Sequence, residues 1–266
     1  MNNINLKKII YFCYLLIKIS INNYMRDLDK ELTVFSRCAC LGKSCIDELK
    51  IKKSINMQKG RIDMYCKKLK ITKPIFLYPY LKRFDVFNIY NEIYFQDFYK
   101  RKYKFIVMDS FSELADSKFI MPNKSVFFGF KNDINIRKLE TKKGLYLSQL
   151  KLLELEEMYS EGFKNLNKFL KCNIYFILYP YKYETNKHYI KRGKFIRKIL
   201  KKLSLNLPYL KIIEIDNKFV RKSKVDDFPY HFDKSTVKRF SKKLFESLSY
   251  EDKLFVRNSS EKYINN

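Results

Sequence analysis

A segment near the end of the chain, V-D-D-F-P-Y-H-F-D, contains His231, one of only two histidines in the protein. Asp227 precedes this histidine by four residues. A carboxylate can hold an imidazole in one tautomer, and the imidazole can then take a proton from a nucleophile. A structural interpretation is also open, in which Pro229 breaks the chain and Asp233 or Ser235 caps the next helix. We favour His231 as a site residue.

Candidate nucleophiles follow two apolar runs. Ser36 and Cys38 follow L-T-V-F, and Ser110 follows F-I-V-M-D. A serine hydroxyl at such a position needs a neighbouring base to react. For Ser110 the alternative is that it caps the next helix.

The elements that must position these groups are indicated by the hydrophobic pattern. Short apolar runs predict buried strands at residues 32–35, 74–80, 105–108, 174–179 and 210–215. Apolar residues spaced by three or four predict helices at 148–171, 187–203 and 237–248. This alternation predicts an α/β protein whose mostly parallel sheet is covered by helices on both faces. In such a sheet the ligand binds at the carboxyl ends of the strands, where His231 is expected.

The order of elements and the segment D-D-F-P-Y-H-F, with the helix S-T-V-K-R-F-S-K-K-L-F after it, resemble the last block of the SGNH (GDSL-type) hydrolases. More narrowly, the chain resembles bacterial SGNH-like proteins associated with surface-polysaccharide synthesis. Its counterparts to their motifs are T-V-F-S-R-C-A-C, K-G-R-I-D-M-Y and F-I-V-M-D-S-F-S-E-L, within residues 31–249. The resemblance implies a single α/β domain of SGNH/flavodoxin-like type that acts as an esterase or O-acyltransferase on acylated carbohydrate.

The resemblance also implies roles for individual residues. Ser36 or Cys38 would attack the carbonyl, His231 would transfer the proton, and Asp227 or Asp226 would orient the imidazole. Substrate contacts would come from Arg37, Gly60, Arg61 and Asp109, with Gly60 and Ser110 donating to the oxyanion. No cofactor is implied. No metal is expected either, because the C-x-C-x4-C spacing is unlike that of structural zinc sites.

The chain departs from the SGNH pattern in three places. Ser36, Arg37 and Cys38 stand where Gly-Asp-Ser is expected, the Gly-x-Asn-Asp block is absent, and Asp227 is four residues from His231 instead of three. A catalytically inactive glycan-binding protein is therefore one alternative. A sialyltransferase-like glycosyltransferase is another, because F-D-V-F-N-I-Y-N-E-I-Y-F-Q-D-F-Y at residues 84–99 resembles a segment of those enzymes.

The charge and the termini bear on partners and location. Lysine and arginine number 55 against 28 acidic residues, a net charge of +27. Such a charge attracts anionic partners, and we consider an anionic membrane surface among them. The lysine doublets are dispersed and no arginine-rich block occurs, which argues against a nucleic-acid site. We expect a cytoplasmic, membrane-peripheral protein with reduced cysteines.

We divide the chain into an apolar and basic extension (1–24), the α/β domain (25–253) and a polar tail (254–266). The apolar run of the extension is interrupted by Lys18 after nine residues, too short to cross a bilayer. Translation could also begin at Met25.

Overall fold

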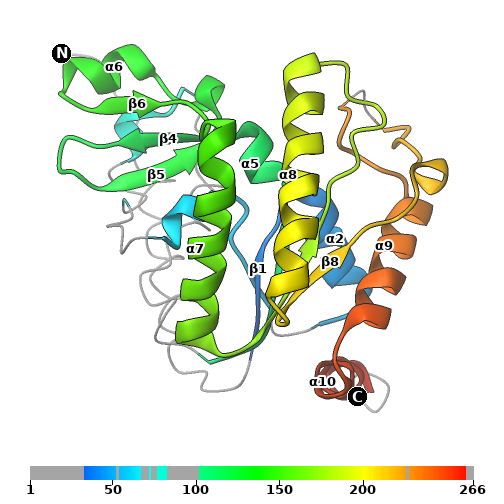
Figure 1. Ribbon diagram of the computed structural model, residues 1–266. Coiled ribbons are helices and arrows are strands. Elements are labelled where there is room, and N and C mark those ends of the chain that lie inside the picture. Colours follow the sequence, from blue (N-terminus) through cyan, green and yellow to red (C-terminus); the bar gives the residue numbers. More distant parts are fainter. Residues whose placement is uncertain are drawn as a thin grey trace, which may run out of the picture. The chain divides into compact units, whose positions relative to one another are not determined.

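The computed structural model describes residues 33–51, 54–66, 72, 77–82, 102–225 and 228–261, all within one compact unit that spans 33–266. The expected extension (1–24), the segment 84–99, Asp226 and Asp227 lie outside the described residues. The described chain has the α/β architecture that the sequence predicts, with a parallel sheet flanked by helices (Figure 1).

The main sheet has five parallel strands in the order β2-β1-β3-β7-β8. They are β1 (Thr33–Arg37), β2 (Ser54–Asn56), β3 (Tyr103–Asp109), β7 (Asn173–Ile177) and β8 (Leu210–Ile213). The central strands are apolar almost throughout because both faces of the sheet are covered, and Phe35, Ile106 and Ile174 are fully buried. This order has a flavodoxin-like topology.

Two pairs of helices cover the two faces of the sheet in the described chain. They are α2 (Cys40–Glu48), α7 (Leu152–Leu170), α8 (Lys187–Asn206) and α9 (Lys234–Ser247). Helices α7 and α8 pack together on one face, and α2 and α9 pack together on the other (Figure 1). Helix α9 begins where the sequence predicts a cap, because the Asp233 side chain accepts a hydrogen bond from the Thr236 N–H at 2.8 Å.

A small antiparallel sheet separates β3 from α7 in the sequence, in the order β5-β4-β6. Its strands are β4 (Ser117–Ile120), β5 (Val126–Gly129) and β6 (Leu145–Leu147), and it is accompanied by α5 (Phe111–Ala115), η4 (Lys131–Asp133) and α6 (Ile136–Thr141). The rings of Phe119 and Phe127 stack across β4 and β5 with centroids 4.6 Å apart. These strands are only three or four residues long, which is too short for a clear alternating pattern.

One predicted strand differs from the structure, and one helix crosses an expected boundary. The described part of the strand expected at 74–80 is a helical turn, η2 (Tyr78–Tyr80), and its central Pro79 has no N–H to donate to a sheet. Helix α10 (Tyr250–Glu261) runs across residue 253, where we expected the domain to end, and its Val256 is buried. The remaining turns are η1 (Ile62–Met64) and η5 (Asn217–Phe219). None of the helices that the structure describes is long and apolar enough to cross a membrane.

Candidate functional site at the carboxyl edge of the sheet

The strand order fixes where a ligand site is expected. From β1 the chain moves to β2 on one side and later to β3 on the other, so the order reverses between the carboxyl ends of β1 and β3. Ligands of such sheets bind in the crevice at this reversal point. Here β1 leads through Cys38 and Ala39 directly into α2, so the first turn of α2 stands at this edge.

A pocket of about 270 Å³ lies beside the first turns of α2. The described residues that line it are Cys40, Leu41 and Ser44 of α2, Ser223, Val225, Tyr230, His231 and Phe232 of the segment before α9, and Val237 of α9. We call it the Cys40–His231 pocket. Cys40 is exposed and His231 is half-buried, and both residues contribute to this one concave surface.

Aromatic packing and backbone hydrogen bonds hold His231 at the pocket. Tyr230 is buried with its ring centroid 5.0 Å from that of Phe111, and the Phe228 ring lies 4.8 Å from the His231 ring. The His231 carbonyl accepts a hydrogen bond from the Ser223 N–H at 2.8 Å. These contacts anchor the segment around the histidine.

The opposite wall is anchored in a similar way. The N–H of Leu41, in the first turn of α2, donates to the Tyr179 hydroxyl at 2.7 Å, and Tyr179 follows the end of β7. The Tyr179 ring also lies 5.7 Å from the Tyr230 ring, centroid to centroid. One side chain at the edge of the sheet thus supports both the helix that carries Cys40 and the segment that carries His231.

Ser36 and Cys38, the predicted nucleophiles after β1, are fully buried and do not line the pocket. The Ser36 hydroxyl lies 2.8 Å from the Asn56 Oδ1 and 3.3 Å from the Ile55 carbonyl of β2. The Cys38 Sγ lies 3.5 Å from the Val107 carbonyl, and burial raises the pKa of this thiol well above its usual value. The structure therefore separates both groups from the pocket that contains His231.

Ser110 and Asp109, at the end of β3, are also buried. The Ser110 Oγ accepts a hydrogen bond from the Tyr179 N–H at 3.0 Å, so it braces β7. The Asp109 carboxylate accepts from the Ala39 N–H at 2.7 Å and from the Phe111 N–H at 3.1 Å. Burial raises the pKa of Asp109 to about 7, and the nearby Arg37 guanidinium opposes that rise.

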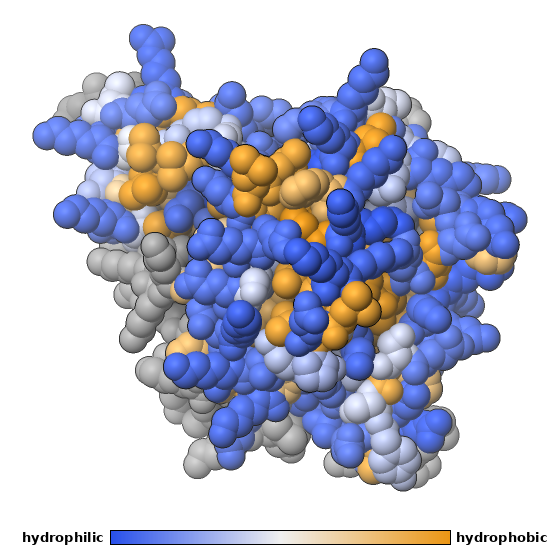
Figure 2. Space-filling view, in the orientation of Figure 1, coloured by the Kyte–Doolittle hydropathy of each residue, from blue (hydrophilic) through white to orange (hydrophobic). Residues whose placement is uncertain are grey.

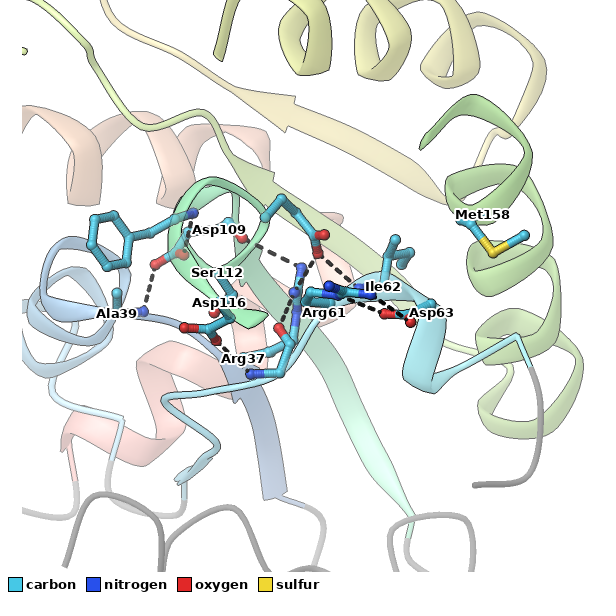
Figure 3. Close-up of polar contacts among 12 residues, drawn as sticks. Arg37, Ala39, Arg61, Ile62, Asp63, Asp109, Ser112, Asp116 and Met158 are labelled. Atoms are coloured by element: carbon cyan, nitrogen blue, oxygen red, sulfur yellow. Dashed lines mark hydrogen bonds and ion pairs between the residues drawn. The ribbon is translucent and has the colours of Figure 1, made fainter. Parts of the chain in front are cut away.

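Two of the predicted substrate contacts, Arg37 and Arg61, form part of a buried ion cluster (Figure 3), and the backbone of Gly60 is hydrogen-bonded to it. The Arg37 Nη1 donates to the Glu113 Oε1 at 2.7 Å and to the Gly60 carbonyl. The Gly60 N–H donates to the Asp116 Oδ2 at 3.0 Å.

Arg61 completes the cluster, because its Nε and Nη2 donate to the two carboxylate oxygens of Asp63 at 3.0 and 2.9 Å. The structure brings these residues together, but their polar groups bind one another inside the protein and not at the pocket. Sequence reasoning treated their charges as available to a ligand, although a buried charge needs a partner of its own.

Cys40 is the residue that sequence reasoning missed. Cys38 and Cys40 both lie in the S-R-C-A-C segment, but the strand ends at Arg37 and the helix begins at Cys40, so the first thiol faces inward and the second faces out. The signal was present in α2 itself, where Leu41, Cys45 and Ile46 form the buried stripe and leave Cys40 off it.

Comparison with models of known protein families gives no match, and comparison with curated proteins gives none either. Within the described ranges, no group of three or more histidine, cysteine, aspartate and glutamate side chains is arranged to hold a metal ion.

Proposed function

We propose that the protein is an SGNH-like acyl-handling enzyme, an esterase or O-acyltransferase, whose nucleophile is Cys40 and whose general base is His231. The observation that supports this most directly is that both residues line one pocket beside the first turns of α2, the helix that follows β1. In this assignment His231 is the general base, as the sequence analysis predicts. The nucleophile is the exposed Cys40 instead of the buried Cys38.

The chemistry follows from the two groups. His231 takes the thiol proton of Cys40, and the sulfur attacks the ester carbonyl, forming a C–S bond. The C–O bond of the ester then breaks, and the leaving alcohol receives the proton from the imidazolium. Water or an acceptor hydroxyl next gives its proton to His231 and attacks the thioester, which releases the acyl group and restores the thiol.

The position of Cys40 at the start of α2 favours this role. The positive end of the helix dipole stabilises negative charge on the sulfur and on an oxyanion that forms beside it. The pocket volume of about 270 Å³ is near the lower end of the usual range for small-ligand pockets. The pocket therefore fits an acyl group better than a whole glycan, whose sugars would remain outside.

The test is hydrolysis of p-nitrophenyl acetate by the purified protein and by the variants Cys40→Ser and His231→Ala. Each variant should lose roughly a hundredfold or more of the rate, because each removes one half of a nucleophile and base pair. Cys172→Ser is the matched control, since Cys172 is half-buried elsewhere and burial raises its thiol pKa to about 12. It should retain the parental rate.

A burst of p-nitrophenol matched by an acetyl group on Cys40, found by peptide mass spectrometry, would identify the nucleophile directly. Equal rates for the parent and Cys40→Ser would refute the proposed role of Cys40. Equal rates for the parent and His231→Ala would refute the base.

The second candidate is a catalytically inactive SGNH-like protein that binds glycan. The burial of Ser36 and Cys38 favours it, because the positions that correspond to the family's nucleophile are closed to a substrate in this fold, and Ser110, the other candidate nucleophile, is buried too. Binding of an acylated polysaccharide without release of the acyl group, unchanged in Cys40→Ser, would support this candidate over the enzyme.

A further inference from the structure

The outer face of α8 has an unusual composition. Helix α8 has 20 residues, and its buried face consists of Arg192, Ile196, Ile199, Leu200 and Leu203. On the opposite side a recess of about 420 Å³ is lined, among the described residues, by Lys187, Ile190, Lys191, Lys194, Phe195 and Lys198. We call it the lysine recess.

Four ammonium groups of the recess form one stripe. Because a helix turns by about 100° per residue, positions 187, 191, 194 and 198 lie within roughly 60° of one another and extend over about 16 Å of the helix axis. All four side chains are exposed, and within the described part of the chain none of them forms an ion pair. Lys201 and Lys202, one turn further on, differ in this respect because they pair with Glu214 and Glu156.

Apolar side chains accompany the stripe. Ile190 and Phe195 are half-buried within the recess, and Leu205, on the same line as Lys187 and Lys198, is 86% exposed. Figure 2 shows apolar surface among hydrophilic side chains on the face that α7 and α8 form in Figure 1. Leu205 thus adds exposed apolar surface to the line of the four lysines.

We propose that the outer face of α8 is a docking surface for an anionic lipid membrane. Lysines with apolar side chains between them are the composition of helices that lie in the membrane interface, where ammonium groups meet lipid phosphates and apolar groups enter the acyl boundary. A soluble acidic polymer would use the lysines equally well, but it would gain nothing from Leu205 and Ile190. This docking goes beyond the proposed function, and α8 lies on the face of the sheet opposite α2 and α9.

The test is sedimentation of the full chain with vesicles of phosphatidylcholine alone and with vesicles in which about a third of the lipid is phosphatidylserine. The protein should bind only the anionic vesicles. The variant K187Q/K191Q/K194Q/K198Q should bind them more than roughly a hundredfold less tightly, because each lysine near an anionic surface contributes roughly a fivefold factor.

The matched control removes four exposed lysines from α9, in the variant K234Q/K238Q/K242Q/K243Q. It has the same net charge as the α8 variant. The factor by which its binding to anionic vesicles weakens should be less than a tenth of the factor for the α8 variant. A second pair tests the apolar part: Leu205→Ser should weaken binding, whereas Leu153→Ser, at a leucine of α7 that is 91% exposed, should weaken it less.

Equal losses in the two four-lysine variants would overturn the proposal, because the overall charge would then explain binding. Failure of the parent protein to bind anionic vesicles would overturn it too, and so would binding to heparin without binding to vesicles. Ester hydrolysis by the α8 variant should equal that of the parent, so this proposal and the proposed function can fail independently.

Discussion

At the scale of single residues, the interior of this protein is most unusual around the end of β3. Asp109 is a fully buried carboxylate. It accepts hydrogen bonds from the backbone N–H groups of Phe111 and of Ala39, the residue just before Cys40. The same side chain therefore holds the start of α2 in place.

The pH dependence of stability follows from the direction of this shift. Burial raises the pKa of Asp109 to about 7 from an ordinary value of 3.8. Between these two values the folded state holds the proton more tightly than the unfolded state, so the contribution of Asp109 to stability falls as pH rises from about 4 to about 7. The sign is opposite to that of a carboxylate whose pKa is lowered by a salt bridge.

We predict that the unfolding free energy of the parent, minus that of Asp109→Asn, is larger at about pH 5 than at about pH 8 by roughly 2–3 kcal/mol. Urea unfolding of both proteins at the two pH values gives this difference, and groups common to both cancel. A difference that does not change with pH, or that grows as pH rises, would contradict a raised pKa of Asp109 in the folded state.

Residue-scale prediction from the sequence was limited by the direction of side chains. His231 was expected at the carboxyl edge of the sheet, and it lines a pocket there. The thiol assignment depended on where the strand gives way to the helix: Cys38 lies between β1 and α2 and is buried, whereas Cys40 begins α2 and is exposed. Arg37 illustrates a second limit, since its partner Glu113 is 76 residues away and no local pattern indicates that pair.

At the scale of elements, the contact between α2 and the sheet depends on one glycine. A Cβ built on Gly42 would lie 2.5 Å from the Cys38 Sγ and 2.9 Å from the Asp109 Oδ2. Only a residue without a side chain lets α2 approach the strand ends this closely. The helix can therefore present Cys40 beside the segment before α9.

We predict that Gly42→Ala destabilises the protein by about 1–3 kcal/mol through overpacking, although alanine favours a helix by about 1 kcal/mol over glycine. Gly193→Ala in α8 is the control, because the nearest atom to its Cβ would be the Tyr181 Cδ1 at 3.3 Å, and it should change stability much less. Thermal unfolding measures both. Equal melting temperatures for the two variants would contradict the close approach of α2.

Long periodic elements were predictable and short ones were not. Helices α7, α8 and α9 each have 14 residues or more, enough turns for a clear apolar stripe, and all three were predicted. Strand β2 has three residues and the strands of the small sheet have three or four, so no alternation could develop. Their pairing depends on tertiary contacts, such as those between Phe119 and Phe127.

At the scale of the whole molecule, the type of sheet and the net charge could be predicted from the sequence, but the placement of the charges could not. Alternating strands and helices predicted a parallel sheet, and the order β2-β1-β3-β7-β8 gives that sheet a reversal point where the pocket lies. Composition alone gave the net charge of +27. It could not show that buried cations such as Arg37 and Arg61 pair inside the protein while the lysines of α8 remain on the surface.

Among the described lysines only Lys59 is buried, so their like charges repel one another across the surface of the folded protein. Salt screens this repulsion, since the Debye length falls from about 10 Å at 0.1 M to about 3 Å at 1 M, whereas buried pairs are screened little. We predict that the melting temperature rises by about 2–8 °C over this range of sodium chloride, equivalent to roughly 1–2 kcal/mol for a chain of this size.

The variant K234Q/K238Q/K242Q/K243Q should melt higher than the parent at low salt and respond less to added salt. An identical salt response in parent and variant would assign the effect to general salting-out, and a falling melting temperature would mean that attractive surface pairs outweigh the repulsion.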